Sequence, residues 1–189
     1  MRFVVQHLVI PKDGEHESGD AVFVRPSECG GLFAVIDALG HGERAAEAAR
    51  AALEALEEGP DGEGVASIID RLHVRLRGTR GAAAMICRVE EERLEGCAVG
   101  NVDMVSLGTR VPWVPSPGIL GASVRRVRIF QVDLHAGDRL ILFSDGLSRV
   151  DPASCRGLSA ADACRALMDR HRRSHDDATV LIADIETVG

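Results

Sequence analysis

The chain has 189 residues, a net charge of −7 and a hydrophobic share of 46%, which fits one globular domain with a sizeable core. Aromatic residues make up only 3%, so we expect a core built from Val, Ile, Leu and Ala. No run of Lys or Arg is longer than two residues, whereas nucleic-acid binding needs a concentrated basic surface. The composition therefore argues against a nucleic-acid partner.

The cysteines and the apolar segments bear on the cellular compartment. None of the five cysteines forms a C-x-x-C pair, which argues against a thiolate zinc site. An odd number of cysteines without a signal-peptide pattern is typical of reduced thiols in a cytoplasm. No apolar stretch approaches the roughly 20 residues that span a bilayer. We therefore expect a cytoplasmic protein without a membrane partner.

The first forty residues predict three strands, at 2–10, 21–25 and 32–36, because each is rich in apolar and β-branched residues. The polar segment 12–19 reads as a loop. The connection between the second and third strands is short, which favours an antiparallel hairpin.

Two helices are predicted next. Residues 43–58 are rich in Ala, Glu and Leu, all strong helix formers, and Gly59-Pro60 ends the pattern. A second helix is expected at about 63–77.

The second half of the chain is mostly strand-like. Strands are predicted from apolar or alternating patterns at 82–89, 93–99, 102–106, 126–133, 139–143 and 178–185. Residues 108–121 hold three prolines and three glycines and read as a long surface loop. A last helix is expected at 159–172.

The order of these elements predicts an α/β (α+β) sandwich. Helices do not alternate regularly with strands, which disfavours a doubly wound parallel sheet. The pattern suits antiparallel sheets with helices packed outside them. Because no internal repeat or linker is visible, we expect a single domain over residues 1–189.

Four aspartates are placed at the ends of predicted strands. Asp20 and Asp176 precede strands, and Asp37 and Asp145 follow apolar strands. Carboxylates at strand ends can converge on one rim of a sandwich, and hard cations such as Mg²⁺ and Mn²⁺ prefer oxygen ligands. The spacing thus suggests a metal site for phosphate-ester hydrolysis.

A turn or capping role is the alternative for each aspartate. Asp commonly caps helices and initiates turns, and Asp145-Gly146 is a frequent turn dipeptide. For one residue alone this alternative is at least as good as a metal ligand. Four such positions, two of them after buried-looking strands, favour the metal site.

Six short motifs occur in one order along the chain: Glu17-Ser18-Gly19-Asp20, Asp37-Ala38-Leu39-Gly40-His41-Gly42, Thr79-Arg80-Gly81-Ala82-Ala83, Val99-Gly100-Asn101, Phe143-Ser144-Asp145-Gly146-Leu147 and Asp176-Asp177-Ala178-Thr179. In these motifs and their order, the sequence resembles the metal-dependent (PPM-type, protein phosphatase 2C-like) serine/threonine phosphatases of the bacterial SpoIIE branch. The resemblance covers nearly the whole chain. Without an extra sensor, kinase-like or membrane domain, it looks most like the short, stand-alone RsbX-type members.

The resemblance implies a four-layer fold, in which two antiparallel sheets lie between helices, and two Mn²⁺ or Mg²⁺ ions at one end. Asp37 would bridge both ions. Asp20 and the main-chain carbonyl of Ala38 would complete one site, and Asp145 and Asp176 the other. The family usually has Gly at the position of Ala38, and Ala tolerates fewer backbone angles than Gly.

The implied activity is hydrolysis of phosphoserine or phosphothreonine. A water activated by the two metals would attack phosphorus, with the four aspartates as the catalytic residues and no Cys or Ser nucleophile. The resemblance further implies that the substrate is a phosphorylated STAS-domain regulatory protein, such as a stressosome subunit or an anti-anti-sigma factor.

Two other functions remain open at this point. His171, His175, Asp176 and Asp184 could suggest a histidine–aspartate phosphohydrolase, but that chemistry uses a mostly helical scaffold. A catalytically inactive phosphatase fold acting as a binding adaptor is the second alternative. Loss of a metal aspartate would indicate an adaptor, and none is lost.

Five further residues have no settled role. His41 could orient a water or protonate the leaving group, or be an ordinary loop histidine. Arg80 and Arg110 could contact phosphate or be solvated. Trp113 could touch a partner or pin its loop to the core. Asp177 fits a supporting or capping role better than that of a direct ligand.

Overall fold

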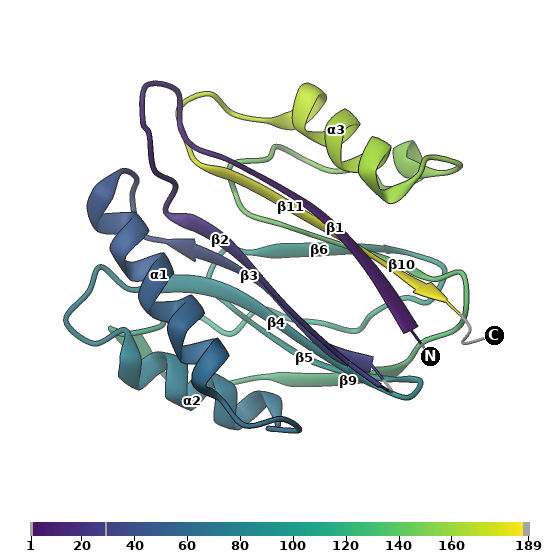
Figure 1. The fold of residues 1–189 in the computed structure, drawn as a ribbon, viewed down its shortest axis with the longest axis horizontal. Helices are drawn as coiled ribbons and strands as arrows, with labels where there is room; N and C mark the ends of the chain where they lie inside the picture. Colours follow the sequence, from purple (N-terminus) through teal and green to yellow (C-terminus); the bar gives the residue numbers. More distant parts are fainter. Residues whose placement is uncertain (1, 29, 187–189) are drawn as a thin grey trace.

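The structure, a computed structural model, describes residues 2–28 and 30–186. Two antiparallel sheets face each other, and helices cover their outer faces (Figure 1). This is the layered sandwich that the sequence predicts. That the chain forms a single domain stays a prediction.

The four-stranded sheet has the order β1-β11-β10-β6, and all its pairs are antiparallel. Its strands are β1 (Arg2–Ile10), β6 (Asp103–Leu107), β10 (Arg139–Phe143) and β11 (Ala178–Glu186). The first and last strands of the chain are therefore neighbours. Because β10 and β11 are antiparallel, the end of β10 and the start of β11 lie at the same end of the sheet.

The five-stranded sheet has the order β2-β3-β4-β5-β9 and is also antiparallel throughout. Its strands are β2 (Asp20–Ser27), β3 (Gly30–Ala38), β4 (Ala82–Glu90), β5 (Arg93–Val99) and β9 (Ile129–Asp133). β2 and β3 form the predicted hairpin, with Asp20 opposite Asp37. A short ribbon is formed by β7 (Gly118–Ile119) and β8 (Ser123–Val124).

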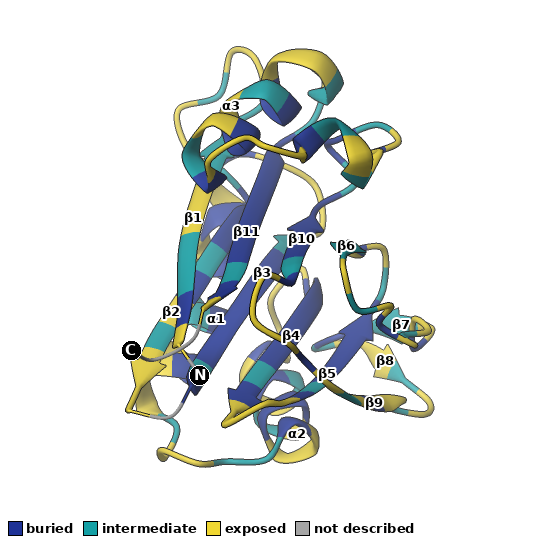
Figure 2. Cartoon of the chain, turned by 90° about the vertical axis from the view of Figure 1, so that its right-hand side faces the viewer, coloured by how far each residue is buried: buried dark blue, intermediate teal, exposed yellow. Residues whose placement is uncertain are grey.

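Helices α1 (Glu43–Glu58) and α2 (Val65–Arg75) lie together on the outer face of the five-stranded sheet, and α3 (Ala160–His171) lies on the four-stranded sheet (Figures 1 and 2). A short 3₁₀ helix, η1 (Pro152–Cys155), precedes α3. The Ser159 hydroxyl accepts a hydrogen bond from the Asp162 amide and caps α3. Within the described residues, none of the helices combines the length and apolarity needed to cross a membrane.

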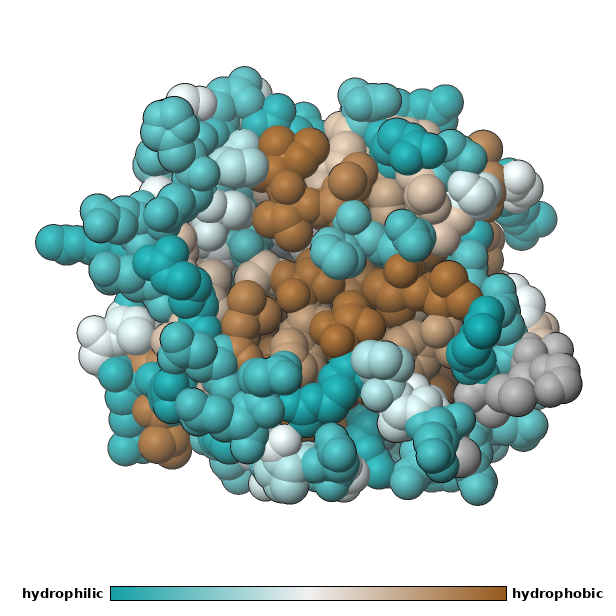
Figure 3. All heavy atoms as spheres, viewed as in Figure 1, coloured by the Kyte–Doolittle hydropathy of each residue, from teal (hydrophilic) through white to brown (hydrophobic). Residues whose placement is uncertain are grey.

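Apolar side chains fill each of the three interfaces between layers. The inner strands are buried along most of their length (Figure 2). The core consists mainly of Ala, Val, Leu and Ile, which confirms the expectation from composition. Figure 3 also shows apolar side chains gathered where β1 and β2, the adjacent edges of the two sheets, lie between α1 and α3.

The segment 108–121 departs from the prediction of a surface loop. Ser116 and Leu120 are completely buried, and Leu120 exchanges two backbone hydrogen bonds with Ala82. Prolines and glycines indicate where the chain turns, but they do not indicate how deeply a segment lies. The strand predicted at 126–133 is also shorter than expected, because β9 begins only at Ile129.

Candidate metal centre

Asp20 and Asp37 lie directly opposite each other on β2 and β3. Asp20 is 5% exposed, and Asp37 is half-buried. The Ser144 hydroxyl donates a hydrogen bond of 2.6 Å to Asp20 Oδ2 and accepts one of 2.9 Å from the Thr179 amide. Thr179 lies in β11 and Ser144 directly follows β10, both in the four-stranded sheet, whereas Asp20 lies in β2 of the five-stranded sheet. These bonds therefore join the two sheets beside the aspartates.

Asp145 and Asp176 come from the neighbouring edge of the four-stranded sheet, just after β10 and just before β11. The chain approaches itself closely here, because a Cβ on Gly146 would lie 1.8 Å from the Asp177 carbonyl oxygen. Only Gly fits at that point, which gives a physical reason for the Asp145-Gly146 sequence. The Asn101 amide donates a hydrogen bond to Asp145 Oδ2.

Asp177 has a different role from its neighbour Asp176. It is 2% exposed, and its two carboxylate oxygens accept backbone hydrogen bonds from Lys12 (2.8 Å) and Gly19 (2.7 Å). Asp177 therefore anchors the loop that leads into Asp20. This supports the predicted supporting role for Asp177 and leaves Asp176 as the better candidate ligand.

The environment of these carboxyls disfavours their ionised form. Burial, reinforced by repulsion from neighbouring carboxylates, raises the pKa of Asp20 to about 7 and that of Asp37 to about 8. Burial and the nearby Asp176 also raise the pKa of Asp145. Asp37 Oδ2 is buried and has no hydrogen-bond partner among the described residues. A bound cation would offset both the desolvation and the repulsion.

The donor set fits Mg²⁺ or Mn²⁺ better than zinc. No group of three or more His, Cys, Asp or Glu side chains in the described part of the chain is arranged to hold one ion. Mg²⁺, however, keeps several waters and typically uses one or two protein carboxylates. The pairs Asp20/Asp37 and Asp145/Asp176 match that pattern. The cysteine Cys164 is buried, and burial raises its thiol pKa to about 11, so it is a poor metal ligand.

Ala38 occupies a backbone conformation that alanine adopts without strain. It lies in β3, and Glu91 is the only non-glycine residue with a positive φ in the described residues. The Ala38 amide donates a 3.0 Å hydrogen bond to the Gly19 carbonyl. The change from the family's usual glycine therefore leaves the local strand geometry intact.

His41 lies in a small polar network beside this centre. Its Nδ1 lies 2.8 Å from Glu15 Oε1, and its Nε2 lies 2.8 Å from Lys12 Nζ. Both ring nitrogens are thus engaged by the loop that Asp177 anchors. His41 is not an isolated loop histidine, although these contacts do not assign it a chemical role.

The other candidates take separate positions. Arg80 donates a 3.4 Å hydrogen bond to the Leu39 carbonyl, beside the Asp37 loop. Arg110 is exposed, and no contact within the described residues joins it to the four aspartates. Trp113 packs against the core between the sheets and donates a 2.9 Å hydrogen bond to the Met104 carbonyl. These contacts favour the second of its two expected roles, pinning the loop to the core.

Sequence reasoning assigned no role to Ser144, Asn101, Lys12 or Glu15. Ser144 and Asn101 occur in the motifs Phe143–Leu147 and Val99–Asn101. Their place in these motifs is a usable signal of a role at the site. The contacts of Lys12 and Glu15 with His41 depend on how the loop folds back, and no local pattern encodes them.

The family model for Stage II sporulation protein E (SpoIIE) matches residues 30–186. The chain belongs to the SpoIIE family. This match spans β3 to β11, so it includes Asp37, Asp145 and Asp176, while Asp20 lies outside it. The predicted family is thereby confirmed.

Relatives of this SpoIIE-family chain match it over almost their whole length. It is 28% identical over 190 residues to phosphoserine phosphatase RsbX from Bacillus subtilis (strain 168), covering 96% of this chain and 95% of RsbX. A crystal structure of RsbX in complex with magnesium superposes with a TM-score of 0.85 and 26% identity, covering 96% of this chain and 94% of that one. A chain from a structural study of the bacterial stressosome gives a TM-score of 0.89 and 31% identity, with coverages of 97% and 100%.

The fold also bears on the phosphohydrolase alternative. That chemistry was expected on a mostly helical scaffold, whereas two antiparallel sheets carry the motifs here. Asp184 forms an ion pair with Arg139, at the other end of β11 from Asp176. The structure therefore argues against a histidine–aspartate site.

Proposed function

We propose that this SpoIIE-family chain is a Mg²⁺- or Mn²⁺-dependent protein phosphatase that hydrolyses phosphoserine or phosphothreonine. The observation that carries the proposal is the convergence of unpaired carboxylates from both sheets, with Asp37 Oδ2 buried and without a partner among the described residues. The likeness to phosphoserine phosphatase RsbX supports the reaction type, and the magnesium complex of RsbX supports the choice of a divalent cation.

Two metal ions would be held by two groups of oxygen ligands. Asp37 would serve both ions, with Asp20 and the carbonyl of Ala38 completing one set and Asp145 and Asp176 the other. When bound, the ions would supply the positive charge that activates a water and neutralises the phosphoryl oxygens. The pairs Asp20/Asp37 and Asp145/Asp176 and the unsatisfied Asp37 oxygen support two neighbouring cation positions. The part of Asp37 in the second position is taken from the family resemblance.

Other side chains would keep these carboxylates in place. Ser144 orients Asp20 through its hydroxyl, and Asn101 orients Asp145 through its amide. Asp177 holds the backbone before Asp20. Such partners restrict the rotation of ligating carboxylates and raise metal affinity.

The substrate is proposed to be a phosphorylated STAS-domain regulatory protein, such as a stressosome subunit or an anti-anti-sigma factor. The likeness to RsbX and to a chain from a stressosome study supports a regulatory phosphoprotein in general. The STAS identity and a cytoplasmic location stay predictions from the sequence resemblance.

The test is turnover of an aryl phosphate and of phosphorylated STAS-domain proteins, with and without Mn²⁺ or Mg²⁺. We expect metal-dependent release of phosphate that EDTA abolishes. A protein that binds a phosphorylated STAS domain but releases no phosphate from any substrate would instead be the inactive adaptor.

A further inference from the structure

A hollow of about 280 Å³ includes Asp145 in its lining but none of the other three aspartates of the proposed centre. Its lining includes Asp103, Asp145, Ser148, Arg149 and Arg173. The hollow is therefore continuous with the proposed metal centre, but most of it is built from the segments that follow β10 and α3. A group that fills it would lie beside Asp145, one of the proposed metal ligands.

Backbone hydrogen bonds join two of the segments that line this hollow. The Ser148 amide donates to the His171 carbonyl, and the Arg173 amide donates to the Gly146 carbonyl, each at 2.8 Å. Leu147 and Arg172 form an antiparallel bridge between these bonds. The two segments that carry Arg149 and Arg173 are thus fixed side by side.

Both arginines keep hydrogen-bonding capacity. Arg173 donates one 3.1 Å hydrogen bond, from Nη1 to the Asp145 carbonyl. Neither Arg149 nor Arg173 forms an ion pair with a carboxylate among the described residues. A guanidinium carries five N–H donors in a planar fork that matches a carboxylate, so most of these donors are available to a ligand.

If Asp145 binds the metal, the two arginines outnumber the remaining acidic side chain in the lining of the hollow. Asp103 is then the one remaining acid of the lining, and its Oδ1 already accepts a 2.7 Å hydrogen bond from the Met104 amide. The protein as a whole carries a net charge of −7. The two arginines therefore give this hollow a charge opposite to that of the protein as a whole.

We infer that this hollow is a specificity subsite, in which Arg149 and Arg173 bind an acidic side chain that neighbours the phosphoserine of the substrate. The inference rests on the proposed phosphatase function and adds a substrate class to it. The metal centre takes the phosphoryl group, and the arginine subsite takes a carboxylate next to it in the peptide.

The experiment compares two phosphoserine peptides of equal length, one with Glu and the other with Gln on both sides of the phosphoserine. Wild-type protein with Mn²⁺ is expected to show a lower KM for the Glu peptide. Arg149→Ala and Arg173→Ala should each raise that KM by about threefold to tenfold. Arg149→Ala should leave kcat, the KM for the Gln peptide and the turnover of an aryl phosphate nearly unchanged. Because Arg173 also donates to the Asp145 carbonyl, Arg173→Ala is judged by the ratio of the KM values for the Gln and Glu peptides, which should fall toward one.

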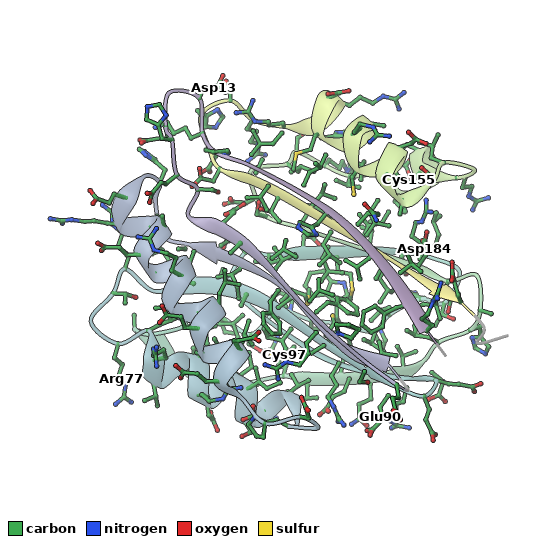
Figure 4. The ribbon with its side chains drawn as sticks, in the orientation of Figure 1. Asp13, Arg77, Glu90, Cys97, Cys155 and Asp184 are labelled. Atoms are coloured by element: carbon green, nitrogen blue, oxygen red, sulfur yellow. The ribbon has the colours of Figure 1, made fainter. Side chains whose placement is uncertain are left out.

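Three further variants sharpen the test. Arg173→Lys should keep part of the preference, because it keeps the charge but loses the fork. Asp103→Asn, which keeps an acceptor for the Met104 amide, should lower the KM for the Glu peptide. Arg77→Ala, an exposed arginine beyond α2 (Figure 4), is the control and should change nothing.

Two results would overturn the subsite. One is a wild-type enzyme that turns over both peptides with equal KM. The other is a loss of kcat on the aryl phosphate in Arg149→Ala equal to the loss on the peptides, since that would place Arg149 at the phosphoryl group. Absence of metal-dependent turnover on every substrate is a distinct result, because it removes the proposed phosphatase function and the subsite together.

Discussion

The two ends of the β2–β3 hairpin differ in whether their charged side chains have partners. At the far end, which is next to the turn between β2 and β3, Arg25 donates to the Leu56 and Gly59 carbonyls at the end of α1. Arg71 pairs with Glu63 nearby. At the near end, where β2 begins and β3 ends, Asp20 and Asp37 face each other, and the charged side chains that act on Asp37 are carboxylates.

This difference shows where the fold meets its own electrostatic needs and where it does not. At the far end, backbone carbonyls accept from Arg25 and a carboxylate pairs with Arg71, so charge is balanced there. One nitrogen of Arg71, Nη1, is buried without a hydrogen-bond partner among the described residues. Buried like charges at the near end cost free energy unless something neutralises them. An external divalent cation is the simplest means of neutralising them.

The largest effect is expected for Asp37→Asn. Asparagine keeps the size of the side chain but lacks the charge proposed to hold both ions, so Mn²⁺-dependent hydrolysis of an aryl phosphate should fall by about 10²–10³-fold. Steady-state kinetics over a range of Mn²⁺ concentrations would measure it.

Asp184→Asn is the matched control from a paired carboxylate. Asp184 binds Arg139 through two hydrogen bonds, and Arg139 also donates to the Cys155 carbonyl (Figure 4 labels Asp184 and Cys155). This variant should lose roughly 1–3 kcal/mol of stability in urea unfolding and keep its kcat. Equal loss of activity in both variants would contradict the contrast between paired and unpaired carboxylates.

The metal-free protein should become less stable as the pH rises. A carboxyl whose pKa is higher in the folded protein stabilises the fold below its ordinary pKa, and that contribution is lost as the pH rises through the folded value. With values of about 7 for Asp20 and about 8 for Asp37, the loss should extend from about pH 4 to about pH 8. Thermal unfolding in EDTA would follow it.

Mg²⁺ should reverse much of this loss near pH 8, because a ligand that binds only the folded state stabilises it. Asp37→Asn in EDTA should show a smaller decline with pH than the wild type. An apo protein that is equally stable at both ends of this pH range would argue against the buried, repelling carboxylates.

Asp177→Asn should damage stability more than metal dependence. The substitution places an amide against one of the two backbone N–H groups that Asp177 now binds, at a cost of about 1–3 kcal/mol. Activity should fall only through the displaced loop and should remain Mn²⁺-dependent. If Asp177→Asn abolished metal binding while Asp176→Asn kept it, the assignment of the two neighbours would be reversed.

The smallest effect is expected for Trp113→Phe. Phenylalanine keeps the packing against the core but loses the hydrogen bond to the Met104 carbonyl, which is worth about 1 kcal/mol. Stability measured by urea unfolding should drop by that amount, with no change in phosphatase kinetics. A loss of substrate binding would instead point to a partner contact.

Much of the fold could be predicted because local patterns determine it. The helix at 43–58 and the strand at 139–143 have the bounds that the sequence predicts. The depth of residues 108–121 could not be predicted, since the burial of Leu120 depends on its pairing with Ala82, which lies far away in sequence.

The candidate site shows the same division. The four aspartates were found from their places at strand ends, and the family resemblance alone separated Asp176 from Asp177. The structure favours the same choice, because backbone amides from the Asp20 loop bind both oxygens of Asp177, whereas a neighbouring amide binds one oxygen of Asp176. The contacts of Lys12 and Glu15 with His41 could not be predicted, because they join elements that are distant in sequence and outside any local pattern.

The most direct test of the central claim is a calorimetric titration of the metal-free protein with Mn²⁺, comparing the wild type with Asp37→Asn. If the acidic end of the sandwich is the metal centre, the wild type should bind two ions per chain, and the variant should lose at least one of them. Unchanged stoichiometry and affinity in Asp37→Asn, or no binding by the wild type, would contradict the account.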